Sequence, residues 1–125
     1  MIIESAALCL ALNIYHEARG ESLKGQRAVA LVTLNRAKRK SERICHEVFK
    51  PFQFSWTIHW NIQQHGVQDF LAFEKALKVA KWALKLPHDF TGGATHYHAV
   101  YVAPKWKYSF KAIGTIGKHH FYKRS

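Results

Sequence analysis

The sequence predicts a mainly helical α+β domain. Apolar side chains recur at helical spacing over residues 3–18, 23–39 and 70–84, which indicates three helices. The segments 94–98 and 113–122 are short, rich in β-formers and bounded by glycine, which favours a small extended element. With 125 residues, 48% of them hydrophobic and 22% charged, the chain suits one buried core. We expect a single domain over residues 1–125, with no internal repeat or linker.

The first two helices have clear boundaries. Helical spacing runs from Ile3 to Ala18, and Gly20 is a natural C-terminal stop. Ser22 is suited to cap a second helix, which we expect to extend to about Arg39. Glu21 lies next to the positive end of that helix, where a carboxylate is stabilised.

The remaining elements follow in order. Residues 43–49 indicate a short helical turn before Pro51, and the aromatic alternation over 52–57 favours an extended segment along a groove. Asp69 is suited to cap an amphipathic helix that ends before Pro87. Residues 91–93 then form a turn before the short extended segment at 94–98.

The net charge indicates which kinds of partner the protein binds, and the cysteines and the N-terminus bear on where it is made. Nineteen Lys and Arg against eight Asp and Glu give a net charge of +11, which favours nucleic acid, an anionic membrane face or an acidic cell-wall polymer as partner. We expect Cys9 to be a buried free thiol rather than part of a disulfide with Cys45. The N-terminus lacks the basic region of a signal peptide, so we expect synthesis in the cytoplasm.

The nine histidines do not predict a metal site. His16-Glu17 begins like a zincin motif, but Gly20 occupies the position of the second histidine. His96 and His98 would share one face of a strand, yet a third ligand would have to come from elsewhere in the chain. We expect no metal or cofactor, and a zinc-dependent amidase resting on this pair is a minor alternative.

Glu17 is the best candidate for chemistry. It lies at the end of an apolar helix, where burial raises a carboxyl pKa and prepares it to donate a proton. A surface salt bridge to Arg19 is the structural alternative, but the other acids have capping, turn or surface explanations. Glycosidases ordinarily use two carboxylates. A single candidate favours glycan cleavage in which muramic acid supplies its own 6-hydroxyl as the second group.

Seven motifs in order carry a resemblance to a known family. They are YHEARGE at 15–21, GQRAVA at 25–30, NR at 35–36, QFS at 53–55, GATHY at 93–97, PKW at 104–106 and IGKHHFY at 116–122. The chain resembles the SleB-like cell-wall hydrolases, or spore-cortex-lytic enzymes, which have a lysozyme-like transglycosylase fold. The likeness covers nearly the whole chain.

The resemblance implies an endolysin-type enzyme that cleaves the β-1,4 bond between N-acetylmuramic acid and N-acetylglucosamine, with Glu17 as general acid. It implies a lytic transglycosylase, with a hydrolytic muramidase as the alternative. The residues implied to bind the glycan strand are Gln53, Ser55, Thr95, His96, Tyr97, Tyr15 and Glu21. Tyr15 fits the core equally well. We expect the enzyme to act as a monomer.

The chain departs from the usual family pattern in lacking a secretory signal and wall-binding repeats. A bare, basic catalytic domain resembles a bacteriophage endolysin, made in the host cytoplasm and released to the periplasm and cell wall through a separate pore-forming protein. The positive charge would favour contact with anionic envelope polymers. An alternative of another class is a basic nucleic-acid-binding module. The basic residues are spread along the chain, so we expect no specific nucleic-acid partner.

Overall fold

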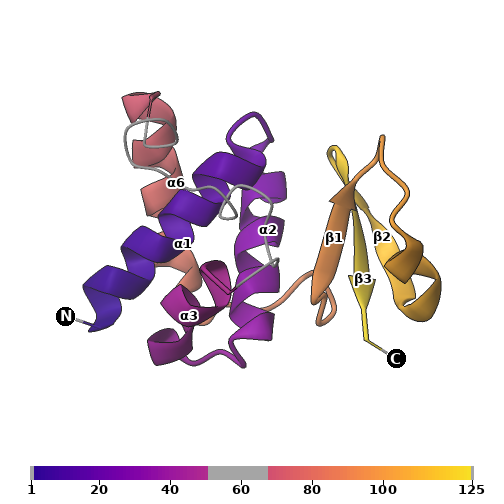
Figure 1. Cartoon of the computed structure of the whole chain (residues 1–125). Helices are drawn as coiled ribbons and strands as arrows, with labels where there is room; N and C mark the ends of the chain where they lie inside the picture. Colours follow the sequence, from indigo (N-terminus) through magenta and orange to yellow (C-terminus); the bar gives the residue numbers. More distant parts are fainter. Residues whose placement is uncertain (1, 51–67, 125) are drawn as a thin grey trace.

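The computed structural model describes residues 2–50 and 68–124, with side chains from residue 6 onward. A group of helices forms one part of the molecule and a small sheet forms the other, with β1 nearest to α2 (Figure 1). The elements are α1 (Ile2–Ala18), α2 (Leu23–Arg36), the 3₁₀ helix η1 (Ser41–Arg43), α3 (Ile44–Val48), α6 (Phe70–Ala83), β1 (His96–Ala99), the 3₁₀ helix η2 (Lys105–Ser109), β2 (Lys111–Ile116) and β3 (His119–Lys123). The predicted mainly helical class is confirmed.

The helix starts follow the predicted caps. The Ser22 hydroxyl accepts a hydrogen bond from the Gly25 amide at 3.2 Å, and Asp69 accepts from the Ala72 amide at 3.0 Å. The predicted end of the second helix at Arg39 is wrong. The helix ends at Arg36, and the next turn places Lys38 and Arg39 at φ values of 55° and 58°. These left-handed conformations cannot continue an α-helix.

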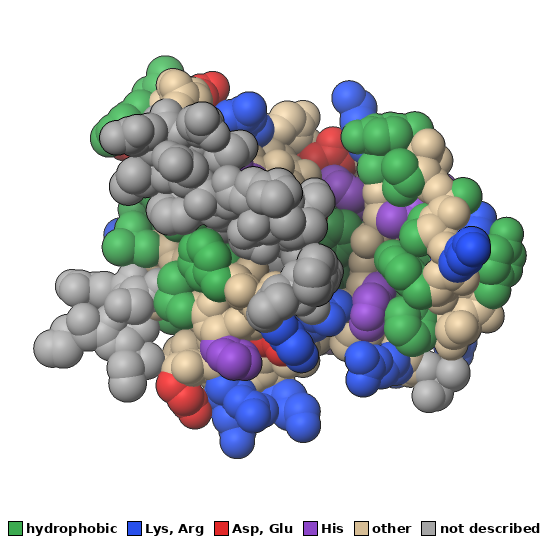
Figure 2. Space-filling model, viewed as in Figure 1, with side chains coloured by type: hydrophobic (Ala, Val, Ile, Leu, Met, Phe, Trp, Pro, Cys, Tyr) green, Lys and Arg blue, Asp and Glu red, His purple; other side chains and the backbone are tan. Residues whose placement is uncertain are grey.

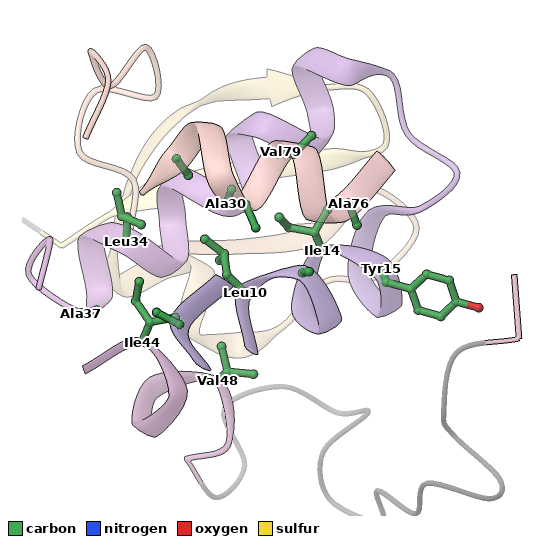
Figure 3. Close-up of a cluster of buried hydrophobic side chains, with 14 residues drawn as sticks. Leu10, Ile14, Tyr15, Ala30, Leu34, Ala37, Ile44, Val48, Ala76 and Val79 are labelled. Carbon is green, nitrogen blue, oxygen red and sulfur yellow. The ribbon is translucent and has the colours of Figure 1, made fainter. Parts of the chain in front are cut away.

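The main core joins α1, α2, α3 and α6 (Figure 3). Leu10 and Ile14 of α1 are fully buried at its centre, with Leu34 of α2 and Ile44 of α3 around them. A second cluster links α2 to the sheet through Val29, Val32 and Phe121, together with Ala18, Ala28 and Ala94. This second cluster fixes the position of the sheet relative to the end of α1.

The sheet has the strand order β1-β3-β2, and both pairings are antiparallel. The sequence suggested one glycine-punctuated extended segment over 113–122. The structure instead shows a hairpin, in which Gly117 adopts φ +57° at the turn between β2 and β3. The 3₁₀ helix η2 was not predicted. Among the helices of the described residues, none has the length and apolar character needed to cross a membrane.

The prediction for the cysteines is wrong. Cys9 of α1 and Cys45 of α3 form a disulfide, with their Cα atoms 5.2 Å apart. The two residues are 36 positions apart in sequence, and the packing of α1 against α3 brings them together. The disulfide therefore ties the helix that carries Glu17 to its neighbour in the core.

Candidate active site

Glu17 lies in the last turn of α1, where it meets β1. The Tyr97 hydroxyl donates a hydrogen bond of 2.7 Å to Glu17 Oε1, across 80 positions of sequence. The side chain of Glu17 is partly buried at this junction. The structure therefore brings together two of the predicted site residues, one from the helices and one from the sheet.

The electrostatics of the pair favour a protonated carboxyl group. Burial raises the pKa of Glu17, and the hydrogen bond from Tyr97 opposes part of that rise. Burial, followed by the nearby Glu17 charge, also raises the pKa of Tyr97 well above its usual value. Tyr97 therefore remains a donor. Because it occupies Oε1, a proton carried by Glu17 resides on Oε2.

Two neighbouring residues at the end of α2 bind the backbone just before β1. Asn35 Nδ2 donates to the Ala94 carbonyl at 2.9 Å and to Asp89 Oδ2 at 2.8 Å. Arg36 Nη1 donates to the Thr95 carbonyl at 2.7 Å. These bonds fix the backbone that immediately precedes Tyr97, so the Asn-Arg pair of the sequence acts as a positioning element for the Glu17–Tyr97 contact.

Asp89 completes this support. Burial by itself would raise the pKa of Asp89, but hydrogen bonds from Thr91, Asn35 and Gly93 outweigh burial and lower that pKa. The Thr91 and Gly93 amides donate to the carboxylate at 2.8 and 2.9 Å. Asp89 is thus an ionised anchor for the turn before β1.

Glu21 is held by the β2–β3 turn. The Lys118 amide donates to Glu21 Oε1 at 2.7 Å, and His119 Nδ1 lies 3.5 Å from the same oxygen. The Glu21 side chain is only 8% exposed. The His119 ring in turn meets the Tyr97 ring edge-on, with centroids 5.1 Å apart. Glu21 therefore connects the loop after α1 to the hairpin, and its implied glycan contact stays a prediction.

Tyr15 lies in the core. Its ring is fully buried, and its hydroxyl oxygen accepts hydrogen bonds from the Gln68 and Asp69 amides, each at 2.9 Å. The Arg19 guanidinium lies over the Tyr15 ring, 4.6 Å from its centroid. These contacts give Tyr15 the structural role that the sequence left open. A glycan contact of Tyr15 stays a prediction.

Thr95 and His96 line a pocket of about 270 Å³ between the end of α2 and the sheet. The His96 ring packs on Phe110 and Trp106, with centroids 4.2 and 5.3 Å away. Burial, aided by the charges of Arg36 and Arg124, lowers the pKa of His96 to about 4. His96 is therefore neutral at neutral pH. Gln53 and Ser55, and the predicted extended stretch 52–57, lie outside the described residues.

His98 and His96 both pack on the Trp106 ring, but the two ring nitrogens of His98 are taken up by other partners. Its Nδ1 lies 2.8 Å from the Ala99 carbonyl, which can only accept, so Nδ1 carries the proton. Its Nε2, 2.8 Å from the Tyr122 hydroxyl, therefore accepts a hydrogen bond. Within residues 6–50 and 68–124, no three His, Cys, Asp or Glu side chains come together as metal ligands would. The arrangement gives no support to a zinc site at this pair.

Two residues around the site, Asn13 and Arg124, were not predicted from the sequence. Asn13 donates to Thr33 Oγ1 at 3.0 Å and also hydrogen-bonds Tyr97. A polar residue on the apolar face of the first helix was a visible signal for it. Arg124 lines the same pocket as Thr95 and His96, but one arginine in a basic tail gave no signal of that position.

Comparison with known proteins shows that this chain is similar to cell wall hydrolases. A family model described as Cell Wall Hydrolase matches residues 20–122, beginning three positions after Glu17. A spore cortex-lytic enzyme of Halalkalibacterium halodurans is 31% identical over 115 residues, covering 90% of this chain. The chain spans about a third (33%) of the length of that relative.

Two solved structures share the fold over nearly the whole chain. The catalytic domain of the germination-specific lytic transglycosylase SleB from Bacillus anthracis matches with a TM-score of 0.70 and 28% identity, covering 96% of this chain and 95% of that one. The catalytic domain of the Bacillus cereus SleB protein matches with a TM-score of 0.65 and 29% identity, covering 95% and 91%. The lysozyme-like class implied by the motifs is confirmed.

Proposed function

This chain belongs to the cell wall hydrolase family, and from that premise we propose that it degrades peptidoglycan by cleaving the β-1,4 bond between N-acetylmuramic acid and N-acetylglucosamine. Glu17 is the general acid. The observation that carries the proposal is the partly buried carboxyl of Glu17, which accepts a hydrogen bond from Tyr97 at the junction of helices and sheet. The relatives named as a spore cortex-lytic enzyme and a lytic transglycosylase support the same substrate.

In the first step, Glu17 protonates the glycosidic oxygen. Its proton resides on Oε2, because Oε1 accepts from Tyr97. As the proton moves to the bridging oxygen, the bond from that oxygen to C1 of muramic acid breaks and positive charge develops on the sugar ring. The glucosamine end leaves with a hydroxyl group, and Glu17 becomes a carboxylate.

In the second step, the 6-hydroxyl of the same muramic acid attacks C1. Its proton passes to the Glu17 carboxylate, which restores the acid and releases a 1,6-anhydro product. This path, a lytic transglycosylation, needs one carboxylate. The scarcity of free acids near Glu17 supports it over attack by water.

The other acids of the chain have separate roles or positions. Glu21 is bound to the β2–β3 turn, Glu47 lies 3.7 Å from Arg36, and Asp89 holds the turn before β1. Asp69 caps α6, and Glu42 and Glu74 are exposed. Glu4 precedes Glu17 by 13 residues on α1, which separates them by roughly 20 Å along the helix.

Product analysis tests the proposal. Purified sacculi digested with the protein should release muropeptides that end in 1,6-anhydromuramic acid, detected by mass spectrometry. Reducing ends would instead indicate the muramidase alternative. Release of neither product would refute the proposed function.

We further propose that the enzyme acts outside the cytoplasm, in the manner of an endolysin released by a separate pore-forming protein. The Cys9–Cys45 disulfide supports this, because such bonds persist in oxidising compartments. The net charge of +11 also favours approach to anionic envelope polymers. A lysis assay with the pore-forming protein present and absent tests the release step.

A further inference from the structure

The pocket beside the candidate active site is strongly basic. Four cationic side chains line it: Arg36, Lys38, Lys50 and Arg124. Glu47 is the one acid among its lining residues, and it lies 3.7 Å from Arg36 Nε. Three positive charges therefore remain without a carboxylate among the residues that line this pocket.

These cations come from separate parts of the chain. Arg36 is the last residue of α2 and Lys38 comes two positions later, Lys50 comes after α3, and Arg124 follows β3. Lys38, Lys50 and Arg124 are exposed, whereas Arg36 is largely covered and fixed on the Thr95 carbonyl. Blue side chains gather at the lower end of the hollow between the helical part and the sheet (Figure 2). Folding thus collects like charges at one place, which is costly unless an anion joins them.

His96 is an uncharged residue in the lining of the pocket, which it shares with Arg36 and Arg124. Burial, followed by the charges of these two arginines, lowers the pKa of His96 to about 4. His96 therefore offers hydrogen bonding without further charge. A pocket with two arginines and two lysines around a neutral ring suits a carboxylate.

The pocket lies within reach of a substrate bound at Glu17. Thr95 lines the pocket, and Tyr97, two residues further along the same segment, bonds Glu17. Two residues of extended chain span roughly 7 Å. A substituent on the sugar next to the cleaved bond can cover that distance. In peptidoglycan, muramic acid carries such a substituent on C3: a lactyl group, extended in most strands by an acidic stem peptide.

We infer that the pocket lined by Arg36, Lys38, Lys50 and Arg124 binds a carboxylate carried on the C3 substituent of muramic acid. The inference rests on the proposed function, and it names the part of the substrate that gives the enzyme its preference. The carboxylate belongs either to the stem peptide or, in strands without stems, to the lactyl group.

The test compares Arg124→Gln with the unaltered protein on four substrates. These are glycan strands with stem peptides, the same strands with their carboxylates converted to amides, strands freed of stems by an amidase, and those strands after amide conversion. We expect Arg124→Gln to cleave the strands with free carboxylates roughly threefold more slowly than the unaltered protein, and the double variant with Lys50→Gln roughly tenfold more slowly. Amide conversion should abolish these differences.

The four substrates distinguish the two possible carboxylates, and they distinguish failure of this inference from failure of the proposed function. A difference confined to stem-bearing strands assigns the stem peptide, and one that appears on stem-free strands assigns the lactyl group. Lys75→Gln removes the same charge from an exposed position on α6, so its rate relative to the unaltered protein should not respond to amide conversion. If amide conversion leaves the Arg124→Gln ratio unchanged in both pairs, the inference is wrong while the proposed function stands. If the unaltered protein cleaves none of the four, the proposed function fails and the inference fails with it.

Discussion

Tyr97 donates a 2.7 Å hydrogen bond to Glu17, and this contact joins the last turn of α1 to the first strand of the sheet. The bond fixes one carboxyl oxygen and leaves the other to carry a proton. It also opposes part of the rise in the Glu17 pKa that burial causes. The strength and the pH range of the proposed acid therefore depend on a residue 80 positions away in sequence.

Glu17→Gln should abolish most activity. A glutamine cannot donate an acidic proton, and general acid catalysis contributes about 10²- to 10⁴-fold. We expect release of muropeptides from sacculi to fall by at least roughly 100-fold, measured by chromatography, with Glu42→Gln as an exposed control. The variant should remain at least as stable at neutral pH, because it removes a carboxylate whose burial is unfavourable. Unchanged lysis by a folded Glu17→Gln protein would refute the mechanism.

Tyr97→Phe should shift the pH profile upward. Tyr97 lowers the Glu17 pKa, so its loss lets burial raise that pKa further. Glu17 acts as an acid, and activity falls as pH rises through its pKa, so the alkaline limb of kcat should move to higher pH. The maximal rate should fall roughly tenfold, because the carboxyl loses its orientation. An alkaline limb that stays in place, or moves down, would contradict the assigned role.

Gly117→Ala should be more destabilising than Gly92→Ala. Both glycines have left-handed φ values, +57° and +66°, so each substitution costs about 1 kcal/mol in backbone strain. At Gly117 a new Cβ would also collide with Glu21 Oε1, whereas Gly92 has nothing within 4 Å. Glu21 Oε1 is the far end of a side chain that can turn aside, but it then gives up its hydrogen bond from the Lys118 amide. We therefore expect an additional cost of about 1 kcal/mol at Gly117, measured by urea denaturation.

The double variant Glu21→Ala with Gly117→Ala checks the cause of that difference. Removing the Glu21 carboxylate removes the collision, so part of the extra cost at Gly117 should disappear. Equal losses of unfolding free energy for Gly117→Ala and Gly92→Ala would show that a side chain at position 117 does not clash with Glu21.

Reduction of the Cys9–Cys45 disulfide should lower stability. The bond closes a loop across 36 positions of sequence. Loop entropy predicts a loss of about 3–4 kcal/mol when it opens. The melting temperature of the unaltered protein should fall when dithiothreitol is added. A Cys9→Ser, Cys45→Ser double variant should melt at a lower temperature than the unaltered protein without dithiothreitol, and adding dithiothreitol should not change its melting temperature. An equal melting temperature with and without reductant would contradict the linkage.

Protonation of His96 should destabilise the fold at acid pH. Its pKa is about 4 in the folded protein against 6.5 as the ordinary value, so the unfolded chain binds more protons between these two values. The His96 contribution therefore falls as pH is lowered from 6.5 towards 4 and levels off below. The melting temperature of the unaltered protein should therefore fall relative to that of His96→Gln as the pH is lowered through this window. Parallel curves would show that His96 titrates normally.

Much of the fold could be read from local patterns. The apolar spacing of 3–18, the capping Ser22 and Asp69, and the turn at 91–93 depend on neighbours within a few residues, and the structure bears each of them out. The end of the second helix failed as a prediction because a residue's propensity does not exclude a left-handed φ at Lys38 and Arg39. The hairpin at Gly117 was not predicted for a similar reason. The β-forming residues over 113–122 indicate strand but do not indicate at which residue the chain reverses direction.

The sequence by itself determined the class of fold and the family motifs, and it predicts Glu17 as the acid, because helical periodicity and the scarcity of acids are properties of the chain. Tertiary structure alone decided the Cys9–Cys45 bond, the hydrogen bond from Tyr97 and the basic pocket that includes Arg124. Each of these joins residues from different elements. Their distances depend on how apolar helix faces and the sheet pack, and no local pattern records that packing.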